Sequence, residues 1–209
     1  MPPDDRPIPR FAAEPPQEAL PYGRWAEALA ERFLEACERI EADEDLGEPG
    51  SVTWFPDRTY AGRTYVPATA PTSTGYEVFG YVSFTREHEG APAEHFQAVA
   101  DFTDETAEAN PDWKLDLSDQ EIATWRGAQG RRGDITLVWG VALEHKGLSV
   151  TAELGPTTTD QCALIEDRFT LVSLDAYTGD YLEVVLWGSD GREVAAESLY
   201  AEDEGEDAG

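Results

Sequence analysis

The stretch ITLVWGVALEHKGLSVTAEL, residues 135–154, carries apolar side chains at every second position on both sides of a short polar segment. This period of two is typical of β-strands, because successive side chains point to opposite faces of a sheet. The polar segment, residues 144–147, has the length of a hairpin loop. We therefore expect an antiparallel hairpin with both apolar stripes on one face. Its expected cross-strand pairs are Leu143–Leu148, Val141–Val150 and Trp139–Ala152.

Similar alternation recurs along the chain after Gly50. We expect a second hairpin between residues 168–175 and 180–187. A third should join residues 180–187 to 192–200, where an Asp-Gly pair is a strong turn signal. Successive hairpins indicate a large antiparallel meander sheet, which either stays open or closes into a partial β-barrel. Further strands are predicted at residues 75–85, 95–103, 113–117 and 121–126.

Residues 23–42 have the periodicity of a helix instead. Their apolar side chains recur at spacings of three and four and form one stripe, while glutamates lie off it. Such a stripe has to be buried against another element, and we expect the sheet to cover it. The fold class that follows is α+β, with an N-terminal amphipathic helix packed on the antiparallel sheet or partial barrel. The stripe consists of Trp25, Leu29, Phe33, Ala36, Cys37 and Ile40.

The two ends of the chain differ in composition from the part between them. Residues 1–22 are rich in proline, which lacks a backbone donor and favours extended geometry, so we expect an arm without regular structure. Residues 201–209 are small and acidic, which predicts a disordered tail. Residues 23–200 are long enough to build one core, and we expect them to form a single α+β domain.

The charge of the chain restricts its partners. It has 43 acidic and 15 basic residues among 209, a net charge of −28. A field of this sign repels nucleic acid and anionic membranes, since binding either one requires basic side chains. A basic protein partner, metal ions or a saline cytoplasm are compatible with it. The first residues show no signal-peptide pattern, and no apolar stretch approaches the ~20 residues of a membrane span. We therefore expect a cytoplasmic protein.

The segment RTYAGRTY, residues 58–65, contains Arg-Thr-Tyr twice. Ala-Gly between the copies indicates a tight turn. Pairing across that turn places Arg58 opposite Tyr65 and Tyr60 opposite Arg63 on one side of a hairpin. Exposed neighbours of this kind stabilise a hairpin through cation–π contact. In the alternative interpretation, the two guanidinium groups bind a carboxylate or phosphate, and these four residues form an anion or ligand site.

Two other polar clusters are candidates for binding. Arg126, Arg131 and Arg132 form the only basic cluster of the sequence, and we consider them candidates for an anion or an acidic segment. A second segment, residues 86–95, is rich in histidine and glutamate, which are zinc-type ligands. Its spacing does not match the helical zinc motif, and a solvated loop is the alternative. Its candidate metal ligands are His88, Glu89 and His95.

The two cysteines, Cys37 and Cys162, are far apart in the sequence and form no Cys-x-x-Cys motif. Both have apolar neighbours, so we expect buried thiols. Whether they pair with each other is open at the level of sequence.

The common catalytic and nucleotide-binding motifs are absent from the sequence. We therefore expect a non-enzymatic binding or protein-interaction protein with no cofactor. Strand 181–187 is apolar on both faces, and a homodimer would cover the face that the helix leaves exposed. The alternative is a small-molecule-binding β-barrel, with hydrolase or isomerase activity in an aromatic pocket. The expected pocket residues are Trp54, Tyr65, Tyr76, Phe84 and Trp139.

Overall fold

The computed structural model describes residues 20–88, 90–127, 130–177 and 180–199. These residues form the helix α1 (Gly23–Cys37) and three antiparallel sheets, which we call the front, middle and back sheets. Most of the expected arm and all of the expected acidic tail lie outside the described residues.

The front sheet contains β1 (Thr53–Trp54), β2 (Arg58–Tyr60), β3 (Arg63–Pro71), β4 (Glu77–Thr85) and β5 (Glu94–Thr103). The middle sheet has the order β10 (Arg168–Asp175), β7 (Arg132–Ala142) and β6 (Leu115–Arg126). The back sheet has the order β12 (Glu193–Ser198), β11 (Leu182–Gly188), β8 (Gly147–Leu154) and β9 (Thr157–Ala163).

Helix α1 confirms the predicted amphipathic helix. Leu29, Phe33, Ala36 and Cys37 are buried, and α1 packs mainly on β4 and β5. The helix ends at Cys37 instead of residue 42. Acidic residues follow this end, where negative charge opposes the helix dipole. No helix in the described part of the chain is long and apolar enough to cross a membrane.

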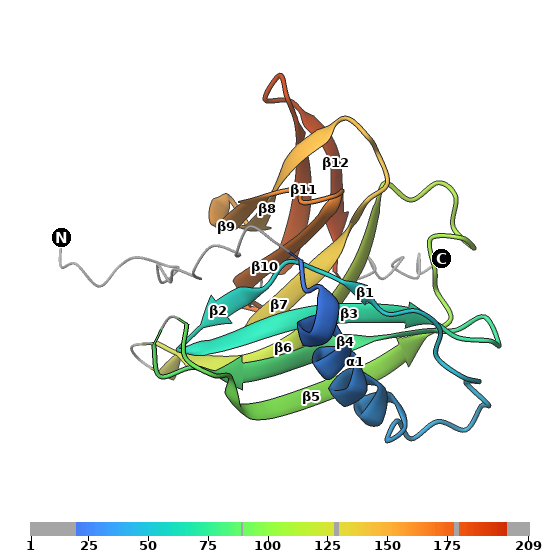
Figure 1. Cartoon of the computed structure of the whole chain (residues 1–209). Coiled ribbons are helices and arrows are strands. Elements are labelled where there is room, and N and C mark those ends of the chain that lie inside the picture. The colour runs from blue at the N-terminus through green and yellow to red at the C-terminus, as the bar shows by residue number, and fades with distance from the viewer. Residues whose placement is uncertain (1–19, 89, 128–129, 178–179, 200–209) are drawn as a thin grey trace, which may run out of the picture.

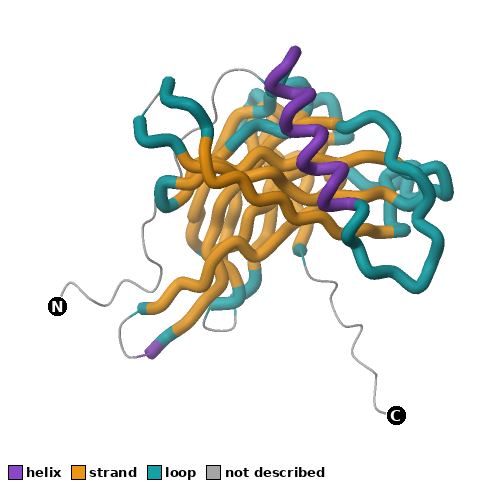
Figure 2. Tube along the Cα trace, turned by 60° about the horizontal axis from the view of Figure 1, so that its bottom comes forward, coloured by secondary structure: helices purple, strands orange, loops and turns teal. Residues whose placement is uncertain are grey.

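The elements are stacked in four layers: α1, the front sheet, the middle sheet and the back sheet. One core lies between α1 and the front sheet, a second between the front and middle sheets, and a third between the middle and back sheets. The strands of the back sheet run across those of the front sheet (Figure 1). Figure 2 shows α1 lying over one face of the strands. Both faces of β7 and β10 are therefore buried, whereas β6 at the edge of the middle sheet is largely half-buried or exposed.

The predicted hairpin between residues 135–143 and 148–154 is wrong. β7 pairs with β6 and β10 in the middle sheet, whereas β8 pairs with β9 and β11 in the back sheet. β8 alternates in burial as predicted, whereas β7 is buried on both faces, and the two strands meet face to face across a core that contains Val138 and Val150. A short loop can join stacked sheets ~10 Å apart as well as paired strands, and alternation does not distinguish the two. Leu143 and Leu148, the expected first pair, are exposed beside this loop.

Of the other two hairpin predictions, one is confirmed and one is wrong. β11 pairs with β12, as expected, but β10 pairs with β7 and not with β11, so the predicted hairpin of residues 168–175 with 180–187 is wrong. The segments 113–117 and 121–126 are parts of one strand, β6, which has a bulge near Glu121.

The sheets of the described residues are not closed, so the partial barrel is wrong as well. The α+β class with antiparallel sheets is confirmed.

Stacking explains the strands that are apolar on both faces. In β4, Val78 and Val82 face α1, while Phe79 and Tyr81 face the middle sheet. In β11, the stripe of Leu182, Val184 and Leu186 is fully buried against the middle sheet. Stacked sheets thus cover apolar faces for which the sequence predicts cover by a helix or a second subunit.

Candidate functional site

The RTYAGRTY segment forms the predicted hairpin. β2 and β3 pair in the expected register, and the hydroxyls of Thr59 and Thr64 are 2.9 Å apart on the side away from the arginines. Ala61 and Gly62 both have positive φ, 50° and 79°, which is the geometry of a two-residue type I′ turn. The local turn signal was therefore sufficient to fix this register.

The two arginines of the hairpin have different environments. Arg58 is 2% exposed, and its guanidinium donates to the carbonyl oxygens of Thr170 and Gln161, both at 2.9 Å. It also lies 3.3 Å from a carboxylate oxygen of Asp160. These partners belong to β10 and β9, so one side chain of the front sheet joins the middle and back sheets. Arg58 is buried at this junction and is no longer a candidate for an exposed anion site.

Asp160 completes the junction. Its carboxylate accepts hydrogen bonds from the backbone N–H groups of Gln161 at 2.8 Å and Val172 at 2.9 Å. β9 and β10 diverge here into different sheets. Arg58 and Asp160 therefore bind backbone groups of these two strands that a neighbouring strand would otherwise bind. Burial raises the pKa of Asp160, while Arg58 and the two N–H groups act in the opposite direction.

The other three residues of the hairpin do not join Arg58 in one ligand site. Arg63 donates to the Ser83 hydroxyl at 3.2 Å and to the carbonyl oxygen of His95 at 3.0 Å, within the front sheet. Tyr65 is buried and packs edge-on against Tyr81, with ring centroids 5.3 Å apart. Tyr60 is half-buried against the same core, between the front and middle sheets.

The basic cluster lies at the end of the β6–β7 hairpin. Arg126 and Arg132 are cross-strand neighbours, and both are exposed, as is Arg131. Beneath them, Trp125 packs edge-on against Tyr177, with centroids 5.3 Å apart. The structure thus places two of the predicted cations side by side, and anion binding at this end stays a prediction.

The metal prediction gains no support from the described residues, among which no three His, Cys, Asp or Glu side chains are grouped to hold an ion. Glu89 lies outside the described residues. His88 is in the loop before β5 and His95 is in β5 itself. Cys37 and Cys162 are not paired with each other, and burial raises the pKa of both thiols to about 11.

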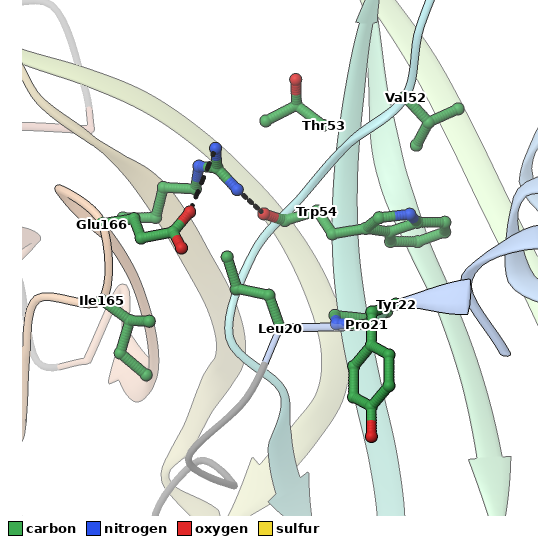
Figure 3. Close-up of a pocket in the computed structure, with 9 residues that line it drawn as sticks. Leu20, Pro21, Tyr22, Val52, Thr53, Trp54, Ile165 and Glu166 are labelled. Atoms are coloured by element: carbon green, nitrogen blue, oxygen red, sulfur yellow. Dashed lines mark hydrogen bonds and ion pairs between the residues drawn. The ribbon is translucent and has the colours of Figure 1, made fainter.

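A cleft of about 540 Å³ opens where three separate segments meet in front of the helix (Figure 3). Six of its nine lining residues are apolar, but polar atoms form the larger part of the exposed wall, which carries one cation. The Arg168 guanidinium donates to the carbonyl oxygen of Trp54 at 3.1 Å and lies 3.9 Å from the Glu166 carboxylate. Sites for small organic ligands have volumes of about 300–1,000 Å³. The lining residues are Leu20, Pro21, Tyr22, Val52, Thr53, Trp54, Ile165, Glu166 and Arg168.

The cation of the cleft is held by a tight turn between β9 and β10. Ile165 and Arg168 exchange two backbone hydrogen bonds, of 2.8 and 3.0 Å. Between them, Glu166 and Asp167 both have positive φ, 53° and 63°. Residues other than glycine adopt this backbone conformation at a cost of about 1–3 kcal/mol each, and such residues are frequent at binding sites. The turn is also anchored to β7, because the Ala142 N–H donates to the Asp167 carbonyl oxygen at 2.8 Å.

The aromatic residues expected to form one pocket are spread over different layers. Trp54 lines the cleft and also packs against α1, where Phe84 lies too. Tyr65 and Trp139 are buried between the front and middle sheets, and Tyr76 packs edge-on against Phe102. Of the five expected pocket residues, only Trp54 lines this cleft.

A pair of carboxylates lies between the front and middle sheets. Glu77, the first residue of β4, faces Asp116 of β6. Burial, and then the Asp116 carboxylate, raise the pKa of Glu77 to about 7. Burial also raises the pKa of Asp116. Glu77 therefore titrates near neutral pH, but neither residue lines the cleft.

Apart from Trp54, sequence reasoning missed the residues of the cleft. Trp54 and Arg168 are 114 positions apart, and only the stacking of the sheets brings them together. A weak signal was present in Ile-Glu-Asp-Arg, residues 165–168, where two acids precede an arginine between alternating segments. Such a segment predicts a turn but not what the arginine will face.

The chain was also compared with protein-family models, curated proteins and solved structures, and none of the three comparisons finds a match.

Proposed function

We propose that the protein is a non-enzymatic binding protein of the cytoplasm, and that the cleft in front of α1 is its binding site. The observation that carries the proposal is the position of Arg168, a cation on the wall of a cleft that combines apolar side chains with polar surface. A concave site in which a few polar groups converge beside apolar side chains is a usual form of a ligand site. The positive φ angles of Glu166 and Asp167 support the same location.

Binding is favoured over catalysis by the chemistry of the lining. The charged side chains of the cleft, Arg168 and Glu166, are suited to hold a ligand and lie beside each other. The two thiols are protonated at neutral pH, with pKa values of about 11, and are therefore weak nucleophiles. Glu77 has the pKa of a general base but lies away from the cleft. A hydrolase or isomerase acting on a small molecule remains the alternative proposal.

Native mass spectrometry of the full chain tests the proposal, since it detects a ligand retained through purification. Leu20→Trp is designed to fill the cleft, whereas Leu148→Trp places the same bulk on a leucine that is 57% exposed and does not line the cleft. We expect a retained or added ligand to be lost from the first variant and kept by the second. Equal binding by both variants, or no ligand in any preparation or screen, would overturn the proposal.

A homodimer and a basic protein partner are further proposals. Two aromatic side chains support the homodimer, because Tyr181, just before β11, is 57% exposed and Trp187 is half-buried, while Val185 between them is buried. The apolar surface involved is smaller than expected, since the other stripe of this strand is buried. Sedimentation equilibrium at low and moderate salt tests the dimer, and a strict monomer under both conditions would exclude it.

A further inference from the structure

We infer that the ligand of the cleft is a small organic carboxylate with an apolar body, and that Arg168 binds the carboxylate. This inference rests on the proposed function, because it specifies the ligand of the same cleft. It adds a chemical class: an anionic head group on an aliphatic or aromatic chain.

The first support is the donor geometry of Arg168. One terminal nitrogen of its guanidinium, Nη1, is fixed by the Trp54 carbonyl oxygen at 3.1 Å. The other, Nη2, lies 3.9 Å from Glu166, which is too long for a hydrogen bond. Arginine presents five N–H donors in a rigid fork that matches a carboxylate. The guanidinium is thus oriented by one contact and retains donors for a ligand.

The second support is the weakness of the internal ion pair. The Glu166 side chain is 72% exposed and that of Arg168 is 28% exposed. Exposed pairs of this kind contribute little to stability. A ligand carboxylate can therefore replace Glu166 beside Arg168, while Glu166 turns into water without loss of a buried contact.

The third support is the rest of the cleft wall. Leu20 and Ile165 lie near the ion pair in Figure 3 and offer aliphatic surface, and Trp54 adds its side chain. Helix α1 starts directly after Tyr22 at the rim, and within the described residues it has no side-chain cap and no acid in its first turn. Unpaired N–H groups at a helix start favour an anion nearby. The cation therefore favours a negatively charged group in the cleft, although the whole chain is acidic.

Three probes of similar shape distinguish the contribution of charge to binding from that of the apolar body: phenylbutyrate, phenylbutyramide and phenylbutylamine. Their affinities for the full chain are measured by isothermal titration calorimetry at one salt concentration. A charge-assisted pair is worth about tenfold or more in affinity, so we expect phenylbutyrate to bind at least about tenfold more tightly than the amide. The amine should bind least at the cleft, because it places a cation beside Arg168.

Variants of the ion pair provide an independent test. Arg168→Met should weaken phenylbutyrate binding about tenfold, and Glu166→Gln should strengthen it, because it removes the acid that competes for Arg168. Glu166 is exposed, so this gain does not depend on a change in folding. The matched control is Arg192→Met, which removes another arginine placed two residues after an acid, 3.6 Å from Asp190 in an exposed turn. We expect no change in that variant.

The outcomes distinguish this inference from the proposed function. If the three probes bind equally well and Leu20→Trp abolishes all three, the cleft is a binding site but the carboxylate class is wrong. If no probe binds, or binding is unaffected by Leu20→Trp, both proposals fall. If Arg168→Met and Arg192→Met weaken phenylbutyrate equally, the effect is one of overall charge, and the role of Arg168 is refuted.

Discussion

Replacing Arg58 by methionine removes a buried guanidinium from the place where the three sheets meet. The methionine keeps an apolar stem of similar length, but it leaves the carbonyl oxygens of Thr170 and Gln161 without this donor. An unsatisfied buried acceptor costs about 1–3 kcal/mol. Asp160, whose side chain is 13% exposed, also loses its counter-ion. Breaking one side of a buried pair typically costs about 3–5 kcal/mol, which we expect for this variant.

Arg63→Met is the matched control, since it changes the same residue type in the second copy of Arg-Thr-Tyr. Arg63 makes two hydrogen bonds in a more exposed environment. Its loss should cost about 1 kcal/mol. Urea denaturation of each variant gives the free energy of unfolding. A total stability of about 5–15 kcal/mol is usual for a domain, so the difference between the variants is easily measured.

Asp160→Asn extends the test to a double-mutant cycle. If Arg58 acts through this carboxylate, the double variant should be more stable than the sum of the two single losses predicts, because no unpaired charge is left in the junction. Additive losses would show that the two side chains act independently. A loss for Arg58→Met no larger than for Arg63→Met would refute the role of Arg58 as the link between the sheets.

The remaining predictions concern the helix, the buried acids and the net charge. Leu29→Ala should destabilise the protein by about 2–5 kcal/mol, while Glu31→Ala should have little effect on thermal unfolding; equal losses would contradict the burial of the stripe. Because Glu77 has a pKa raised to about 7, the folded state binds its proton more tightly than the unfolded state, and this contribution to stability is lost as pH rises through about 7. Glu77→Gln should therefore raise the melting temperature at pH ~8 and change it little at pH ~4, whereas equal shifts at both values would exclude this titration. Sodium chloride between ~0.1 and ~1 M should raise the melting temperature by screening the net charge of −28, and a falling curve would indicate acids already neutralised by pairing or bound cations.

The sequence predicted well the features that depend on neighbouring residues. The stripe of α1 follows from spacings of three and four, and the β2–β3 register follows from Ala61-Gly62. In both cases the interacting residues are close in the chain, so propensity and turn geometry decide the outcome. The β11–β12 hairpin, with Asp190-Gly191 at its turn, belongs to the same group.

The partners of the strands were harder to predict, because alternation shows only that a face is buried. β7 alternates so clearly that a hairpin with β8 looked natural, yet its second face carries Val138, Gly140 and Ala142. These small and apolar residues allow another sheet to pack on that face as well. Their Cβ spacing is the same whether the opposing surface is a paired strand, a helix or a stacked sheet. The third layer was therefore not encoded in any single segment.

The two arginines of the repeat show why the contacts of individual side chains could not all be predicted from the sequence. Arg58 and Arg63 have the same local sequence and lie on the same side of one hairpin, yet one is buried against β10 and the other bonds within the front sheet. The difference arises because β2 pairs only with β3 among the described strands, so its other side is available for β9 and β10 to approach. The β9–β10 turn that follows this approach also places Arg168 beside Trp54. The junction around Arg58 and the cleft around Arg168 thus share one cause, the divergence of β9 and β10 over the edge of the front sheet. If that is correct, Arg58→Met should also weaken ligand binding at the cleft under conditions where the protein remains folded, whereas Arg63→Met should not.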